Sequence, residues 1–358
     1  MKEPYRLLML NAFDSRLDNF QREFQRRGKK VDHFFCRGPK DLCAQTRNFT
    51  RAVDVCDAVI SGLANFPWQI PWLLKAKSMG KPVLLDCPVD ITVAPYAVSW
   101  RKEKMLGWIA RRADGFLTLK SRKYLIEKFR LDPAKVLCVE NCPDLPRIAD
   151  GCKAQPAFFF PPGSVKICYS GVATWQAPER FIPIFKMLCQ KIPSAVWLII
   201  SFLDTPMISK IRKEAQAAGI LEKIIFQPVI KPYENFIATA DQCDLWVSHL
   251  DNDSLLGRLE LRTELLEMGI LGKTITAVST PAMEAHGFVD GRHFIKIDDK
   301  DPAASAEKIA AALKNPTEFY QIGRNLRGHV LSHFSLADSM DRLFDFLESK
   351  KIPAAHEN

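Results

Sequence analysis

The stretch LRTELLEMGILGKTITAV, residues 261–278, passes directly from a helix pattern to a strand pattern, and this order decides the fold class. Apolar side chains three or four positions apart share one face of a helix predicted over residues 258–269, namely Leu261, Leu265 and Met268. Three glutamates share another face of that helix, namely Glu260, Glu264 and Glu267. The strand pattern that follows is typical of nucleotide-binding α/β domains, with an ordinary amphipathic helix as the alternative.

Strand and helix patterns alternate along the rest of the chain, on both sides of a proline-rich break. Residues 143–164 contain five prolines and two glycines and show no helical periodicity. Apolar strands that alternate with helices indicate parallel sheets covered on both faces. We therefore expect an α/β protein with two Rossmann-like domains, over residues 1–150 and 165–334, facing a central cleft. Residues 151–164 are the expected linker.

Length and composition exclude several classes of protein. A chain of 358 residues is long enough for two full cores, and its 47% apolar content is ordinary for a globular protein. It contains no long uncharged apolar run that would predict a transmembrane helix, and its N-terminus does not resemble a signal peptide. Ten cysteines without a CxxC pair or a Cys/His cluster favour reduced, buried thiols over a structural metal.

The net charge of +9 is confined to the first half of the chain. Residues 1–160 carry 28 lysines and arginines against 17 acids, whereas residues 161–358 carry 22 against 24. Such a field attracts an anionic partner, for which lipid headgroups, a phosphorylated acceptor and nucleic acid are the candidates. The stretch 99–112, SWRKEKMLGWIARR, fits a membrane surface, with an ordinary core helix as the alternative.

Two passages of the second half carry a resemblance to a known family. The residues of the first passage are Arg262, Glu267, Gly272, Lys273 and Ile275. Those of the second are Glu284, Gly287, Asp290, Gly291, His293 and Asp298. Both resemble the GT-B glycosyltransferases, specifically the retaining glycosyltransferases of family four. The resemblance implies the GT-B fold, in which the last helix crosses back onto the N-terminal domain, here within residues 335–358.

The resemblance also implies a set of residues that bind a nucleotide-sugar donor. Glu267 matches the carboxylate that accepts both ribose hydroxyls. Gly171 ends a strand, where a glycine lets backbone approach a phosphate. Among its departures from the family, Val172 and Glu264 stand where an Arg and a Lys are usual. Positive charge for the diphosphate is then expected from other residues, namely Arg180, Arg258, Arg262 and Lys273.

Candidate residues of the first half follow predicted strands. Asp86 ends a strand and Asp90 lies four positions later, where the resemblance implies a carboxylate or histidine facing the reacting sugar. A loop aspartate that caps the next segment is the alternative for this pair. Asn11 and Asp14 follow the first strand and are expected on the acceptor side.

The resemblance implies a hexosyltransferase-type enzyme that moves a sugar from a nucleotide sugar to a saccharide or lipid-linked acceptor, with retention, in polysaccharide or glycolipid synthesis. It also implies that neither a metal nor a further cofactor is required. We expect a cytoplasmic protein, with the inner face of the membrane as an alternative location. Two other functions stay open: a non-catalytic GT-B module that binds a sugar or a partner protein, and a GT-B sugar-nucleotide epimerase. Nucleic-acid binding ranks last, since no recognised module is present.

Overall fold

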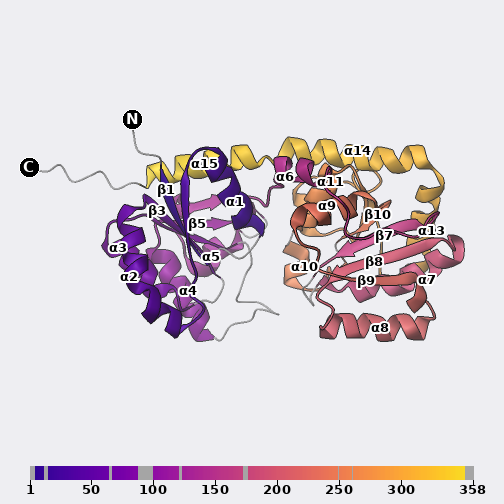
Figure 1. The fold of residues 1–358 in the computed structure, drawn as a ribbon, viewed down its shortest axis with the longest axis horizontal. Helices are drawn as coiled ribbons and strands as arrows, with labels where there is room; N and C mark the ends of the chain where they lie inside the picture. The colour runs from indigo at the N-terminus through magenta and orange to yellow at the C-terminus, as the bar shows by residue number, and fades with distance from the viewer. Residues whose placement is uncertain are drawn as a thin grey trace, which may run out of the picture. The chain divides into compact units, whose positions relative to one another are not determined.

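The chain divides into two compact units, each built around one parallel sheet. In the computed structural model, unit 1 comprises residues 1–142 and 335–358, and unit 2 comprises residues 143–334 (Figure 1). The structure describes eight ranges of the chain, namely residues 5–11, 15–63, 67–87, 100–120, 123–171, 176–248, 250–259 and 261–350.

Unit 1 contains a six-stranded parallel sheet in the order β2-β1-β3-β4-β5-β6. Its strands are β1 (Arg6–Leu10), β2 (Lys30–Phe34), β3 (Ala58–Gly62), β4 (Val83–Asp86), β5 (Gly115–Thr118) and β6 (Val136–Cys138). Its first five helices are α1 (Ser15–Arg26), α2 (Pro39–Val55), α3 (Ile70–Ser78), α4 (Trp100–Arg112) and α5 (Tyr124–Phe129). Helices α2 to α5 share one apolar core against the sheet, which includes the stacked rings of Phe49 and Trp72.

The last helix, α15 (Leu336–Ser349), belongs to unit 1 and lies beside α1 (Figure 1). Its Phe344 ring meets the ring of Phe24 edge-on, with centroids 5.0 Å apart. Phe346 packs so closely on Gly115 that a Cβ there would lie 2.5 Å from the ring. This placement confirms that the C-terminal helix crosses back to the N-terminal half of the chain.

Unit 2 contains a second six-stranded parallel sheet, in the order β12-β11-β10-β7-β8-β9. Its strands are β7 (Val165–Ser170), β8 (Ala195–Ser201), β9 (Ile224–Pro228), β10 (Leu245–Val247), β11 (Thr274–Ala277) and β12 (Ile295–Lys296). This is the strand order of a Rossmann domain, with the topological switch between β7 and β10. The two sheets confirm the predicted α/β class with two Rossmann-like domains.

Helices cover both faces of the unit 2 sheet (Figure 1). One face carries α7 (Phe181–Lys191), α8 (Pro206–Ala218) and α13 (Pro302–Lys314). The other face carries α9 (Tyr233–Asp241), α11 (Thr263–Ile270) and α14 (Pro316–His333). Three shorter helices complete the unit: α6 (Leu145–Gly151), α10 (Leu255–Leu259) and α12 (Pro281–Ala285). The core between α7 and the sheet is aromatic, because Phe181 and Phe185 both pack against the fully buried Trp197.

The segment between the two sheets differs from the expected linker. The units divide after Cys142, and residues 143–164 belong to unit 2. Gly151 of α6 packs against Ile237 of α9, where a Cβ would lie 2.6 Å from the isoleucine. Farther along, Gln242 donates to the Phe158 carbonyl across 2.8 Å. Helix contacts and hydrogen bonds therefore fix the proline-rich stretch to α9.

The helix predicted over residues 258–269 is broken in two, which corrects the sequence-based expectation. Arg262 is extended, with φ −67° and ψ 136°, and α11 begins only at Thr263. Of the three glutamates predicted to share one face, Glu264 and Glu267 lie on α11, and Glu260 lies outside the described residues. The reason for the break is a tertiary contact of Arg262, described below.

Candidate functional site

Gly171 lies at the carboxyl edge of the unit 2 sheet, directly after β7 and next to the topological switch. The Gly171 amide donates to the Ile200 carbonyl across 3.2 Å. A Cβ at this position would lie only 2.2 Å from both the Tyr169 hydroxyl and Gln176 Oε1. A larger residue at this position would therefore displace the Tyr169 ring or the Gln176 side chain. Val172, the residue expected in place of an arginine, lies outside the described residues.

Arg262 contacts the residue before Gly171 and is almost completely buried, with 2% of its surface exposed. Its Nη2 donates to the Ser170 carbonyl across 2.6 Å, which ties the start of α11 to the end of β7. The same nitrogen lies 3.2 Å from Glu264 Oε1, and the guanidinium lies 5.3 Å from the centre of the Tyr169 ring. The structure therefore brings three predicted residues together: Gly171, Arg262 and Glu264.

Glu267, one turn farther along α11, is buried with 6% exposure. The Tyr233 hydroxyl donates to its Oε1 across 2.7 Å. Burial raises the pKa of Glu267 to about 8, and the nearby Glu264 carboxylate adds to this, against the opposing effects of Tyr233 and Arg147. A buried carboxylate with a pKa near neutrality is a feature of functional sites more often than of ordinary helix faces.

Tyr233, the first residue of α9, is a part of the site that sequence analysis missed. The Arg147 guanidinium lies 4.0 Å from the centre of its ring, a cation–π distance. Arg147 Nε also lies 3.2 Å from Glu234 Oε1. Burial, followed by the charge of Glu267, raises the pKa of Tyr233 well above its ordinary value, so the hydroxyl stays a donor. The ring is thus fixed on one side by Arg147 and at its tip by Glu267.

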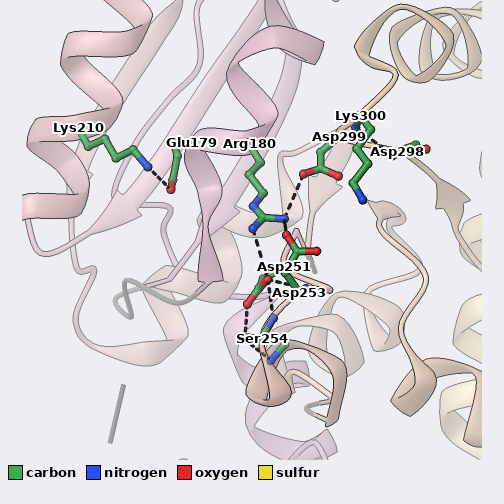
Figure 2. A network of polar contacts seen from close by, with 10 residues as sticks. Glu179, Arg180, Lys210, Asp251, Asp253, Ser254, Asp298, Asp299 and Lys300 are labelled. Atoms are coloured by element: carbon green, nitrogen blue, oxygen red, sulfur yellow. Dashed lines mark hydrogen bonds and ion pairs between the residues drawn. The ribbon is translucent and has the colours of Figure 1, made fainter. Parts of the chain in front are cut away.

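Arg180, another expected donor-binding residue, is surrounded by carboxylates (Figure 2). Its guanidinium nitrogens lie 2.8 Å from Asp253, 3.1 Å from Asp299 and 3.6 Å from Asp251. Asp251 also accepts the backbone amides of Asp253 and Ser254, which shapes the turn before α10. These acids come from two loops after different strands, so no sequence spacing indicated that they compensate the arginine.

Lys273 lies apart from the other donor-binding candidates. Lys273 immediately precedes β11 and therefore lies at the amino edge of the sheet, opposite Gly171. Its Nζ lies 3.0 Å from Asp241 Oδ1 and also donates to the Asp241 carbonyl at the end of α9. A lysine there stabilises the helix terminus. We expected Lys273 among the donor-binding residues, and the structure does not bring it to them. Arg258 is exposed on α10.

The described candidates in unit 1 hold its interior together. Asp86 has no exposed surface, and its Oδ1 lies 3.1 Å from Arg16 Nη2, which is also buried. Arg16 further donates to the Val139 carbonyl across 2.5 Å. Asn11, with a positive φ of 53°, accepts the Cys36 amide across 2.8 Å and so joins the ends of β1 and β2. Asp14 and Asp90 lie outside the described residues.

The described part of the chain contains neither a clustered metal site nor a membrane-spanning helix. No group of three or more His, Cys, Asp or Glu side chains there is arranged to hold a metal ion. Likewise, none of the described helices has the length and apolar character needed to cross a bilayer.

Comparison with solved structures identifies the class of fold. The chain aligns with the crystal structure of Anabaena Alr3699/HepE in complex with UDP and glucose, at a TM-score of 0.73 and 12% identity, over 96% of this chain and 100% of that one. A glycosyltransferase from Rickettsia africae ESF-5 gives 0.71 and 12%, over 98% and 100%. Sucrose-phosphate synthase from Thermosynechococcus elongatus gives 0.68 and 14%, over 96% and 99%.

These neighbours are GT-B glycosyltransferases, and the chain has their fold, as the resemblance in its sequence indicated. No protein-family model matches the sequence, and comparison with curated proteins finds no similar one.

Proposed function

We propose that this protein is a glycosyltransferase that takes a sugar from a nucleotide-sugar donor held at the carboxyl edge of the unit 2 sheet. The observation that carries the proposal is the buried Glu267 carboxylate, which the Tyr233 hydroxyl orients. Glu267 lies on α11, between β10 and β11 in the chain, and β10 is one of the two strands at the topological switch. Ligands of open α/β sheets bind at that edge. The HepE structure, which has the same fold, contains UDP and glucose, so UDP and UDP-sugars are the first donors to test.

The proposed role of Glu267 is to accept hydrogen bonds from both hydroxyls of the nucleotide ribose. The ionised carboxylate is the better acceptor for two hydroxyls, because both of its oxygens then only accept. Because burial holds its pKa at about 8, the free protein at neutral pH contains mostly the protonated form. Nucleotide binding then favours the carboxylate and releases a proton near neutral pH.

The proposed diphosphate site is the backbone at Gly171 together with Arg262. A glycine after a strand lets backbone approach an anion, and Arg262 contacts the preceding residue through its bond to the Ser170 carbonyl. Arg180 faces three carboxylates and Lys273 lies at the other edge of the sheet, so we assign the diphosphate to neither. Arg258, exposed on the nearby α10, is the second cation that we propose.

We further propose a hexosyl transfer with retention and without a metal, to a saccharide or lipid-linked acceptor in polysaccharide or glycolipid synthesis. Retention needs no protein nucleophile when the leaving phosphate assists attack from the same face of the sugar. Asp86 forms a buried ion pair with Arg16. Of the two predicted aspartates, Asp86 and Asp90, we therefore propose that Asp90 faces the reacting sugar.

A second candidate function, a non-catalytic module that binds a sugar or a partner protein, is favoured by one specific observation. Glu264 lies 3.2 Å from Arg262 and partly neutralises the cation that the diphosphate needs. A binding module requires no strong diphosphate site, whereas a transferase does.

The two functions are distinguished by thermal unfolding with a panel of nucleotides and nucleotide sugars, including UDP and UDP-glucose. A ligand of the folded state raises the unfolding temperature in proportion to ln(1 + [L]/Kd). We expect a shift with one nucleotide family that is lost in Glu267→Gln and kept in the control Glu214→Gln on α8. No shift at millimolar concentration would contradict the transferase proposal and favour the binding module.

A further inference from the structure

The positive charge of this protein is concentrated in a short part of unit 1. Residues 100–130 contain ten lysines and arginines and only three acids, whereas the whole chain has a net charge of +9. This stretch includes α4 and α5, which pack against each other. Their outer surface is therefore a strongly cationic region of unit 1.

Helix α4 has two chemically distinct faces. Its inner face is small and apolar and packs into the unit 1 core through Leu106, Gly107, Ile109 and Ala110. Gly107 lies against Phe129 of α5, where a Cβ would lie 3.2 Å from the ring. Successive residues of a helix turn by about 100°, so the residues between these positions share the opposite side. That outer face carries Trp100, Arg101, Lys104, Met105 and Arg112, together with Trp108, which is half-buried and packs against the unit 1 core.

The outer face combines exposed apolar side chains with cations at close range. Trp100 is 62% exposed and Met105 is 40% exposed. Lys104 Nζ lies 4.6 Å from the centre of the Trp100 ring, and the Arg112 guanidinium lies 4.1 Å from the centre of the Trp108 ring. Glu103, the one acid of α4, lies off this face and 3.5 Å from Lys128 of α5. The outer face therefore presents indole rings and positive charge, without an acid to oppose an anionic partner.

We propose that the outer face of α4 docks on an anionic lipid bilayer, with α4 lying in the plane of the interface. Lysine and arginine meet the anionic headgroups, and the exposed Trp100 and Met105 enter the boundary between headgroups and acyl chains. A lipid surface fits better than nucleic acid. Stacking proteins present bare aromatic platforms along a groove, whereas these rings lie on one convex helix and are partly covered by cations of the same helix. Docking is independent of the donor site and goes beyond the proposed function.

Sedimentation with vesicles tests this proposal on the full-length protein. We expect binding to vesicles of phosphatidylcholine with a third phosphatidylglycerol and little binding to pure phosphatidylcholine. The variant Arg101→Gln, Lys104→Gln, Arg112→Gln removes three cations from the outer face. Each cation near such a surface accounts for about a fivefold change in partitioning, so the triple variant should lose about a hundredfold. The matched control removes three exposed cations from unit 2, through Lys186→Gln, Lys213→Gln and Arg327→Gln.

A second variant, Trp100→Ser, keeps the charge and should weaken vesicle binding at least threefold, because it removes an interfacial indole. Circular dichroism and thermal unfolding establish that every variant is folded. Loss of binding in the outer-face variants with retention in the control supports the proposal. Equal binding of the triple variant and its control would overturn it. So would tighter binding to a short single-stranded oligonucleotide than to the anionic vesicles, which would identify a nucleic-acid surface.

Discussion

The hydroxyl of Tyr233 donates to Glu267 Oε1 across 2.7 Å and so joins the first residue of α9 to a buried carboxylate of α11. The two residues are 34 positions apart in the chain. Their contact joins two of the helices that lie on one face of the unit 2 sheet. It orients the carboxylate to which we assign ribose binding, and it lowers the cost of ionising that group inside the protein.

Replacement of Tyr233 by phenylalanine should weaken both folding and nucleotide binding. It removes the hydroxyl and leaves a buried carboxyl without this donor, which costs about 1–3 kcal/mol of unfolding free energy. The pKa of Glu267 should rise further, because the hydroxyl of Tyr233 lowers it. Urea unfolding and UDP titration measure the two effects. The matched control is Tyr320→Phe, whose side chain is 56% exposed, and an equal loss in that control would disprove the assigned role.

The stability contributed by Glu267 should depend on pH with a definite sign. Its pKa in the folded protein is about 8, above the ordinary value of 4.5, so the folded state binds this proton more tightly than the unfolded state does. The contribution is fully present below pH 4.5 and decreases as the pH rises towards 8. Urea unfolding of the wild type and Glu267→Gln at pH 5, 6.5 and 8.5 measures it. The wild type should lose stability relative to the variant across this range, and a constant difference would refute the raised pKa.

Glu264→Gln should strengthen nucleotide binding. The Glu264 carboxylate lies 3.2 Å from Arg262, so removing its charge frees the guanidinium to interact with a diphosphate. Charged pairs that are only partly exposed have modest energies, and we expect a three- to tenfold lower Kd for UDP by calorimetry. Uridine, which has no phosphate, should bind the two proteins equally. Weaker UDP binding by the variant would show that Glu264 supports the nucleotide site rather than opposing it.

Asp86 should prove structural, because its carboxylate forms a buried ion pair with Arg16 at 3.1 Å. Removing one partner of such a pair leaves an uncompensated buried charge, and Asp86→Ala should lower the unfolding free energy by about 3–5 kcal/mol. The double variant Arg16→Met, Asp86→Leu should recover much of that loss. The contrary result is an Asp86→Asn protein that keeps its stability and loses sugar transfer. It would establish the catalytic role that the position of Asp86 at the end of β4 first indicated.

Sequence patterns were sufficient for the fold but not for the site. Alternating strands and helices predicted two parallel sheets, and the resemblance predicted that the last helix returns to unit 1, as α15 does. Periodicity failed at Arg262, because the bond of that side chain to Ser170, 92 residues earlier, keeps residue 262 extended and breaks the helix. The Tyr233–Glu267 contact and the carboxylates around Arg180 also depend on long-range packing. Spacing along one helix carries no information about such partners.

The central claim is that Glu267 holds the ribose of a nucleotide at the carboxyl edge of the unit 2 sheet. A crystal structure of the protein with UDP tests it most directly. We predict both ribose hydroxyls about 2.7 Å from the Glu267 carboxylate, with the diphosphate beside Gly171. UDP bound elsewhere, or at that edge with its ribose away from Glu267, would contradict the account.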